Sequence, residues 1–338
     1  MAREKQGVAC RLAAQRPKRR RMDNPLANHP DAARIRSSKI EGGVATLIVD
    51  GSGMRNDERK AMEQGLREAA LAIDGVSEVR IALTAARKGA AVLVAIGSGK
   101  GGVGKSTVTA NLAVALARMG KRVGVIDADI YGPSQPTLLD SHERPEARDK
   151  QLIPTRTPSG VSLLSVGQLV PAGQALAWRG PMAAGALAQL IDGDWSEVDL
   201  ILVDLPPGTG DVQLSLVQKA RPAGAVIVST PQDLALIDAT RAIDLFGRTD
   251  VPVLGIIENM AGYACPHCGQ ASDPFGSGGA ESAAARLDVR FLGRLPLSAS
   301  LREASDAGRP PAGEDGPAGE AFAALAKALL DRLETIAR

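Results

Sequence analysis

The stretch AVLVAIGSGKGGVGKST, residues 91–107, decides the fold of this chain. Residues 91–96 form an unbroken apolar run, which predicts a strand buried on both faces. From residue 99 the sequence fits the pattern G-x-x-x-x-G-K-[ST], whose glycines let backbone N–H groups turn towards phosphate oxygens. A helix predicted at 106–119 adds the positive end of its dipole to this loop. The stretch therefore predicts a strand, a phosphate-binding loop and a helix, in that order.

Apolar runs and helical periodicities alternate along the rest of the chain. Strands are predicted at residues 91–96, 123–126, 200–203, 225–229, 253–257 and 289–292, and helices at 106–119, 211–220, 233–247, 280–287 and 318–336. Continuous apolar strands imply burial on both faces, so we predict an α/β fold with a doubly wound, mostly parallel sheet. The last helix mixes acids with bases on its polar face, which favours packing on the sheet over a role as a membrane anchor.

The residues before this domain are expected to form two further segments. Residues 1–40 carry eleven basic and three acidic side chains and are predicted to be a disordered tail. Contact with nucleic acid, or targeting to an organelle, is the alternative reading of this charge. Residues 41–88 show a strand, a helix and a strand, and are predicted to be a small, partial α/β unit. The nucleotide domain is expected to cover residues 89–338.

The bulk composition fits about two globular domains that lie outside the membrane. The chain has 338 residues, of which 44 % are hydrophobic, 23 % charged and 2 % aromatic. No apolar run approaches the length of about 18 residues that a membrane-spanning helix needs. The three cysteines are too few for a disulfide framework, so we expect a reducing, cytoplasmic environment.

Lysine and carboxylate side chains at the strand ends predict an ATP site with Mg²⁺. Lys105 is expected to contact the β- and γ-phosphates, and the Ser106 hydroxyl to bind Mg²⁺. Asp204 follows the strand at 200–203 and is expected to hold Mg²⁺ through water, while Asp129 is expected to position the attacking water. An aspartate that ends a strand can also be an ordinary helix N-cap, and Asp127 is expected to lie behind the site.

Further residues are predicted to surround the nucleotide. The sequence contains no [NT]-K-x-D segment of the kind that reads guanine, so ATP is preferred over GTP. Asn259 and Pro296, each in a loop after a predicted strand, are the candidates for contact with the base. The predicted nucleotide-binding residues are Gly99, Lys100, Gly101, Gly102, Val103, Gly104, Lys105, Ser106, Thr107, Asn259 and Pro296.

Cys265 and Cys268 enclose Pro266 and His267 in a C-x-x-C pair that can direct two thiolates at one metal. A zinc ribbon needs a second such pair, which this chain lacks. A thiol–disulfide site would open a helix in a thioredoxin-like domain, whereas this pair follows a strand in a Gly-rich loop. The third reading joins two copies of the chain, so that four thiolates bind one [4Fe–4S] cluster. We favour this reading and leave shared zinc and redox chemistry open as alternatives.

The motifs together resemble those of the Mrp/ApbC-type iron–sulfur cluster carriers, P-loop ATPases related to MinD and ParA. The matching segments are GSGKGGVGKST (97–107), DADIYGPSQP (127–136), WRGPM (178–182), DLPPGTGD (204–211), STPQDLALIDA (229–239), ENMAGYACPHCG (258–269) and PLSASLREASDAGRP (296–310). The resemblance implies a homodimer that encloses ATP, with Lys100 as the signature lysine that reaches the partner's nucleotide. It implies that Cys265 and Cys268 bridge the cluster, and that residues 204–208 form a switch segment.

One departure from the family concerns the small N-terminal domain that its members often have. Residues 56–88 resemble the second half of that domain, and its first half is expected to be missing or replaced by the basic tail. Any docking role of the domain is then in doubt.

The expected function is that of an ATPase which carries a [4Fe–4S] cluster across a homodimer. Its expected partners are scaffold proteins and apo iron–sulfur proteins, with no membrane and no nucleic acid. Two alternatives remain: a MinD- or ParA-like positioning ATPase on DNA or membrane, and an ATPase that inserts another metal.

Overall fold

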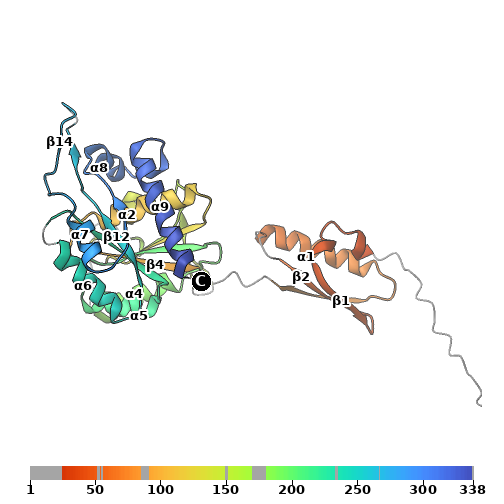
Figure 1. Ribbon diagram of the computed structural model, residues 1–338. Helices are drawn as coiled ribbons and strands as arrows, with labels where there is room; N and C mark the ends of the chain where they lie inside the picture. Colours follow the sequence, from red (N-terminus) through yellow and green to blue (C-terminus); the bar gives the residue numbers. More distant parts are fainter. Residues whose placement is uncertain are drawn as a thin grey trace, which may run out of the picture. The chain divides into compact units, whose positions relative to one another are not determined.

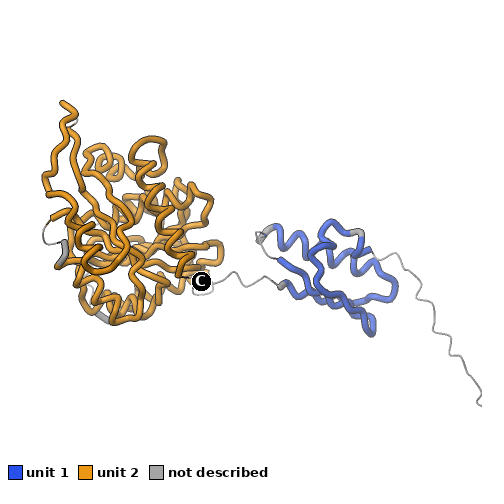
Figure 2. The backbone as a smooth tube through the Cα atoms, viewed as in Figure 1, with its two compact units in different colours: residues 1–88 blue, residues 89–338 orange. Residues whose placement is uncertain are grey.

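In the computed structural model the chain forms two compact units, residues 1–88 and residues 89–338 (Figure 2). This division coincides with the expected start of the nucleotide domain. The structure describes residues 25–51, 54, 56–84, 91–148, 151–169, 180–232, 235–265 and 267–336.

The first unit is a three-stranded sheet covered by one helix. Strand β2 lies between β1, which is antiparallel to it, and β3, which is parallel to it. The elements are β1 (Ile35–Glu41), β2 (Val44–Asp50), α1 (Asn56–Leu71) and β3 (Glu78–Thr84), after two short 3₁₀ turns, η1 (Pro25–Asn28) and η2 (Ala32–Arg34). Every second residue of β2 is buried, and these residues share a core with Met62 and Leu66 of α1. The strand period of two and the helix period of 3.6 thus meet in one small core.

Part of the segment that was predicted to be a disordered tail forms regular structure. Residues 25–40 were expected to be disordered, but they form η1, η2 and most of β1, so this part of the prediction is wrong. Six of the seven residues of β1 are exposed, so the sequence of β1 shows no clear alternation of apolar and polar residues. Its strand structure comes from its pairing with β2. The basic cluster at 16–21 and Cys10 lie outside the described residues.

The second unit contains an eight-stranded sheet in the order β15-β12-β11-β4-β10-β5-β9-β8. Its strands are β4 (Val92–Gly97), β5 (Val123–Asp127), β8 (Thr155–Arg156), β9 (Ser162–Ser165), β10 (Leu200–Asp204), β11 (Gly224–Ser229), β12 (Val253–Glu258) and β15 (Phe291–Arg294). Neighbouring strands are parallel, except that the edge strand β8 is antiparallel to β9. The prediction of an α/β fold with a mostly parallel sheet is confirmed.

Helices cover both faces of this sheet, as the doubly wound prediction requires (Figure 1). Alternate residues of one strand point into different cores: Val94 and Ile96 of β4 belong to one, and Ala95 belongs to the other. Helices α2 (Lys105–Arg118) and α9 (Pro317–Ile336) pack on the first face. The second face is covered by α4 (Gly180–Ile191), α5 (Asp211–Ala220), α6 (Ala235–Gly247) and α7 (Gly279–Arg286).

The remaining elements are short and lie between or beyond the main strands. They are α3 (Gln135–Leu138), the hairpin β6 (Glu146–Arg148) and β7 (Gln151–Ile153), η3 (Val166–Gln168), the hairpin β13 (Tyr263–Ala264) and β14 (Ala271–Ser272), α8 (Ala299–Asp306) and η4 (Pro311–Gly313). The last predicted strand, 289–292, lies two residues later, as β15. Helix α9 packs against α2 and the sheet, as expected from its mixed polar face. Within the described ranges, none of the helices combines the length and apolar character needed to cross a membrane.

Candidate functional site

The phosphate-binding loop joins the central strand β4 to α2. Gly104 is the N-cap of α2 with φ 79°, a conformation that side chains other than glycine rarely adopt. Gly99 packs so closely on α6 that an added Cβ would lie 2.2 Å from the Asp238 carbonyl oxygen. The predicted residues 99–107 therefore form the loop and first turn that the motif implies, at the carboxyl end of a central parallel strand.

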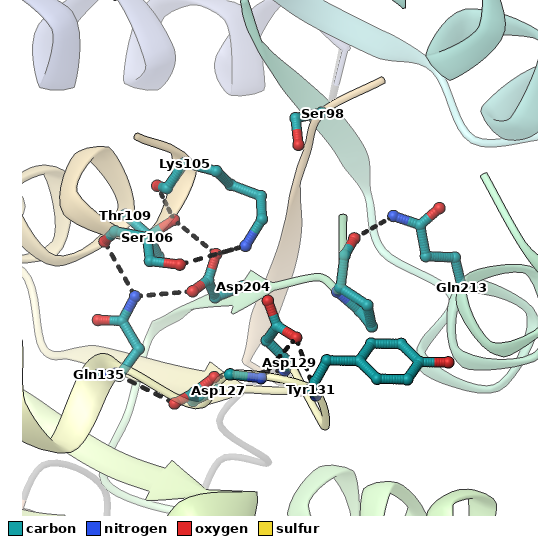
Figure 3. A network of polar contacts seen from close by, with 12 residues as sticks. Ser98, Lys105, Ser106, Thr109, Asp127, Asp129, Tyr131, Gln135, Asp204 and Gln213 are labelled. Atoms are coloured by element: carbon teal, nitrogen blue, oxygen red, sulfur yellow. Dashed lines mark hydrogen bonds and ion pairs between the residues drawn. The ribbon is translucent and has the colours of Figure 1, made fainter. Parts of the chain in front are cut away.

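Asp204 lies at the end of β10, next to this loop, and is fully buried. Lys105 Nζ lies 2.5 Å from Asp204 Oδ1, and Thr109 Oγ1 donates to the same oxygen at 3.2 Å. The other carboxylate oxygen accepts a hydrogen bond from Gln135 Nε2 at 2.9 Å. Figure 3 shows these side chains converging on Asp204 from α2 and α3. The buried ion pair holds the lysine beside the phosphate loop.

Gln135 connects this carboxylate to the loop after β5. Besides its bond to Asp204, its Nε2 donates to the Ser106 carbonyl oxygen at 3.0 Å, and its backbone N–H donates to Asp127 Oδ2 at 3.1 Å. Its Oε1 is buried and has no hydrogen-bond partner in the described structure. A buried acceptor without a partner is uncommon in a folded protein. The Ser106 hydroxyl and the Asp204 carboxylate are hard oxygen donors, the type that Mg²⁺ prefers, so the residues present fit this ion.

Asp127, the last residue of β5, and Asp129, two positions beyond it, differ in role. Asp129 is 8 % exposed, and its Oδ1 accepts the backbone N–H groups of Tyr131 and Gly132 at 3.1 and 3.3 Å. This carboxylate sits at the edge of the site and shapes its own loop. Tyr131, in contrast, is 74 % exposed, and Figure 3 shows its ring beyond Asp129.

Asp127 is fully buried behind the site, where we expected it. Its Oδ2 accepts the Ser165 hydroxyl of β9 at 2.8 Å. Burial, together with the nearby Asp204 carboxylate, raises the pKa of Asp127 to about 7, against the effect of the hydrogen bonds that it accepts. Asp127 therefore ties β5 to β9 and stays away from the loop surface.

Lys100 is held by residues of its own chain. Its Nζ donates to Gln232 Oε1 at 2.8 Å and lies 3.2 Å from Asp238 Oδ2 of α6. The Lys100 side chain is 29 % exposed and that of Asp238 11 %. In this arrangement the lysine points at α6, and the reach towards a partner's nucleotide that the resemblance implies needs these contacts to open.

The segment after β10 contacts both the phosphate loop and α5. The Gly208 N–H donates to the Ser98 carbonyl oxygen at 3.3 Å, and Gln213 Nε2 donates to the Pro206 carbonyl oxygen. Asp211 is exposed at the first turn of α5. Residues 204–208 thus connect the start of the phosphate loop to α5.

The two candidates for base contact lie apart from the carboxylates. Asn259 follows β12, and its Nδ2 donates to the Val103 carbonyl oxygen of the phosphate loop at 2.9 Å. Pro296 follows β15 and is exposed. The neighbouring backbone joins the two loops, because the Ala261 N–H donates to the Leu295 carbonyl oxygen at 2.9 Å.

The thiol pair lies at the tip of the hairpin β13–β14, which projects from the body of the unit in Figure 1. Cys268 is exposed and Cys265 is half-buried, and both are free thiols. The backbone N–H groups of His267 and Cys268 and the Cys268 side chain lower the pKa of the Cys265 thiol. Gly269, with φ 72°, turns the chain and donates its N–H to the Cys265 carbonyl oxygen at 2.8 Å. The hairpin therefore carries two neighbouring free thiols at its tip, of which that of Cys268 is exposed to solvent.

The sequence-based reasoning missed several residues that the structure brings into the site. Lys105, Ser106 and Asp204 come together as predicted, and Asp129 lies at their edge. The contacts of Thr109, Gln135, Ser165, Gln232 and Asp238 were not foreseen. Gln135, Gln232 and Asp238 lie inside the quoted segments 127–136 and 229–239, which was the available signal. Trp178 and Arg179, of another quoted segment, lie outside the described residues.

A glycine-rich loop at the end of a central parallel strand, with a lysine and a buried aspartate beside it, defines the class of P-loop nucleotide-binding proteins. Within this class, the model of the ParA family described as NUBPL iron-transfer P-loop NTPase matches residues 89–330, and the chain belongs to that family. The resemblance noted from the motifs is thereby confirmed.

Relatives of known name agree with this assignment. An iron–sulfur cluster carrier protein of Deinococcus radiodurans is 43 % identical over 311 residues, which cover 88 % of this chain and 88 % of that protein. The iron–sulfur cluster carrier protein of Escherichia coli K12 is 46 % identical over 243 residues, 71 % of this chain and 65 % of its own length. A coverage of 88 % exceeds the second unit alone, so the first relative also matches part of the first unit.

Solved structures share the fold. A nucleotide-binding protein of Archaeoglobus fulgidus in complex with ADP superposes with a TM-score of 0.59 at 41 % identity, covering 66 % of this chain and 89 % of that one. The cell-division ATPase MinD of Pyrococcus furiosus gives a TM-score of 0.56 at 24 % identity, covering 71 % and 98 %. The second similarity concerns the fold alone.

Proposed function

We propose that this protein is an ATP-dependent iron–sulfur cluster carrier, which binds and slowly hydrolyses ATP and transfers a [4Fe–4S] cluster to apo-proteins. One observation carries the proposal: a formed phosphate loop and an exposed thiol pair occur in the same unit, and Asn259, which touches the loop, is only six positions before Cys265. The names of the relatives support the cargo, and the ADP complex of the Archaeoglobus protein supports the nucleotide.

The cargo requires a second copy of the chain. A [4Fe–4S] cluster takes four thiolates, and this chain offers two at the hairpin tip. Among the described residues, no group of three or more His, Cys, Asp or Glu is arranged to hold a metal. Two hairpins related by two-fold symmetry would supply the four ligands. Thiols that must stay reduced fit a cytoplasmic location.

ATP would enter a site whose lysine is already in place. Lys105 would exchange Asp204 for the β- and γ-phosphates, and Asp204 would then be free to hold Mg²⁺ together with the Ser106 hydroxyl. Mg²⁺, when bound, neutralises charge on the phosphate oxygens. Asp129 would orient a water for attack on the γ-phosphorus. The attack breaks the bond between the γ-phosphorus and the β–γ bridging oxygen and yields ADP and inorganic phosphate. Gln135 and Thr109 keep the Asp204 carboxylate oriented throughout.

Lys100 and residues 204–208 would link hydrolysis to the dimer. Lys100 would leave Gln232 and Asp238 to reach the nucleotide of the partner subunit. Loss of the γ-phosphate would then release the segment at 204–208, which holds both the phosphate loop and α5. The purpose of hydrolysis would be to gate the cluster, so a slow rate is sufficient.

The decisive experiment is anaerobic reconstitution of the full chain with iron and sulfide. The wild-type protein should bind about four iron and four sulfide per dimer, with the visible absorption of a [4Fe–4S] cluster. The Cys265→Ala and Cys268→Ala variants should lose the cluster and keep ATP binding, while Gln270→Ala, at an exposed neighbour in the hairpin, should load normally. A cluster that persists in both cysteine variants would refute the assignment. Zinc or another metal in protein purified without oxygen would favour a metal-inserting role.

A further inference from the structure

Two side chains that follow β12 lie directly on the phosphate loop. The Asn259 amide donates to the Val103 carbonyl oxygen at 2.9 Å. A Cβ added to Gly104 would lie 2.3 Å from Asn259 Nδ2 and 3.6 Å from Met260 Cε. The glycine of the loop is therefore what lets this segment approach, and any change in the loop's peptides is felt by residues 259 and 260.

Met260 has an unusual backbone conformation at this contact. Its φ is 63°, in the left-handed region that methionine rarely adopts. Such a conformation persists where the surroundings hold it, and it often marks a switch. Hydrogen bonds hold it on both sides: the Asn259 N–H donates to the Ser229 carbonyl oxygen at 2.8 Å, and the Ala261 N–H donates to the Leu295 carbonyl oxygen at 2.9 Å. The turn is thus a strained, clamped element with an alternative that costs less conformational energy.

Between this turn and the thiols, hydrogen bonds and strand pairs hold the backbone at several points. The Gly262 carbonyl oxygen accepts the Leu297 N–H at 2.8 Å, and Tyr263 forms a parallel bridge with Leu297. Tyr263 then pairs with Ser272 in the hairpin β13–β14. The Cys265 N–H donates to the Gln270 carbonyl oxygen at 3.0 Å. A rotation at Met260 would therefore act on the base of the hairpin, because residues 261–263 share their hydrogen bonds and bridge with residues 295–297.

We propose that residues 259–264 couple nucleotide occupancy to cluster binding, with Asn259 as the positioning residue that follows the phosphate loop and Met260 as the turn that changes state. The inference rests on the proposed function and adds its route of regulation. Coupling between two sites is a free energy that acts equally in both directions. If a nucleotide changes the hold on the cluster, the cluster must change the affinity for that nucleotide by the same factor.

The test measures this factor in anaerobic titrations of full-length protein, with and without a reconstituted cluster. ADP and a non-hydrolysable ATP analogue are the probes. In the wild type, the ratio of dissociation constants between cluster-free and cluster-loaded protein should depart from one by at least about five-fold for one of the two probes. In Asn259→Asp the carboxylate cannot donate to the Val103 carbonyl oxygen, so the ratio should fall to within about two-fold of one.

Met260→Gly provides a second variant, and it leaves the asparagine in place. Glycine adopts positive φ freely, so the turn loses its strain and its clamp on the hairpin; the ratio should again approach one, with both ligands still bound. Gln270→Ala should keep the wild-type ratio. A substitution that weakens nucleotide binding equally in both forms leaves the ratio unchanged, so an unchanged ratio in both Asn259→Asp and Met260→Gly would overturn the inference. A wild-type protein that loads no cluster would overturn the proposed function, and this inference with it.

Discussion

At the scale of single residues, Asp204 organises the nucleotide site. It is fully buried, and its two oxygens receive a lysine from the phosphate loop, a threonine from α2 and a glutamine from α3. A buried carboxylate needs such partners, because removal from water costs several kcal/mol per ion. The site is therefore held together by the same charge that we propose to bind Mg²⁺.

Lys105→Met should reveal the cost of leaving this carboxylate unpaired. The variant keeps most of the side-chain length but removes the cation beside Asp204, so the free energy of unfolding of the nucleotide-free protein should fall by about 3 kcal/mol. Urea unfolding followed by circular dichroism measures this change. Lys100→Met is the matched control, since its ion pair is partly exposed, and it should cost less than about 1 kcal/mol. Equal losses in the two variants would contradict the assignment.

Asp127 makes the stability of the protein depend on pH. Its folded pKa of about 7 lies above the value of about 3.9 in an unfolded chain, so between these values the folded state holds a proton that the unfolded state has released. Stability should therefore fall as pH rises from about 4 to about 7, by at most about 1.4 kcal/mol per pH unit from this group. The Asp127→Asn variant should lack this contribution. The urea unfolding midpoints of the wild type and of Asp127→Asn at pH 5, 6 and 7, measured in EDTA, test this prediction. The same change of midpoint with pH in both proteins would contradict it.

The sequence predicted the residues of the site that belong to a local pattern. Lys105 and Ser106 follow from the spacing of the loop, and Asp204 and Asp129 follow from their places after apolar strands. Gln135 and Asp238 could not be predicted, because an amide or a carboxylate at those positions is equally suited to a solvent-exposed loop or helix. Their roles come from contacts across about 70 to 140 positions of sequence, which only the packing of the strands determines.

At the scale of elements, α6 restrains the phosphate loop from its side. Its Asp238 holds Lys100, and its backbone at the same residue packs against Gly99. The lysine that we propose to reach the partner subunit therefore makes its contacts within its own subunit. Opening these contacts would be a cost of the proposed dimer formation.

Asp238→Asn should lower that cost. Asparagine keeps the shape of the side chain but removes the charge opposite Lys100, and a partly exposed ion pair is worth about 0.5–1 kcal/mol. Because one such pair opens in each subunit, dimer formation in the presence of a non-hydrolysable ATP analogue should tighten by about five- to thirty-fold, as measured by sedimentation velocity. Asp244→Asn removes an exposed ion pair with Arg248 on the same helix and should leave the dimer unchanged. Weaker dimers in Asp238→Asn would show that this contact supports the dimer instead.

The main elements were predictable and the short ones were not. The strands β4, β5, β10, β11 and β12 begin within one residue of the predicted runs, because burial on both faces leaves a continuous apolar signal. Strand β9 has four residues and is defined by its pairing with β5, and β8 has two residues and is defined by its pairing with β9. Helix α4 is rich in Ala and Gly, so its apolar residues show little contrast between faces. Pairing with β2 likewise explains β1, which lies where a tail was expected.

At the scale of the whole molecule, the two units have separate cores. The core of the first unit is formed by residues of η1, β2, α1 and β3, whereas both cores of the second unit contain only residues beyond 90. A unit with its own core can fold alone. The nucleotide site and the thiol hairpin both lie in the second unit.

A chain that starts at residue 89 should therefore fold and bind nucleotide. Its dissociation constant for ADP should lie within about two-fold of the full-length value, because none of the site residues lies in the first unit. Isothermal titration calorimetry and thermal unfolding measure both properties. A truncated chain that remains unfolded, or that binds ADP ten-fold more weakly, would show that the first unit contributes to the site.

The positions of the tyrosines have a practical consequence. The chain contains two, of which Tyr131 lies beside Asp129 at the mouth of the nucleotide site and Tyr263 lies at the base of the thiol hairpin. Biosynthetic incorporation of 3-fluorotyrosine would give one ¹⁹F resonance beside the nucleotide site and one beside the thiol hairpin. A single spectrum could then follow both sites at once, without any engineered label.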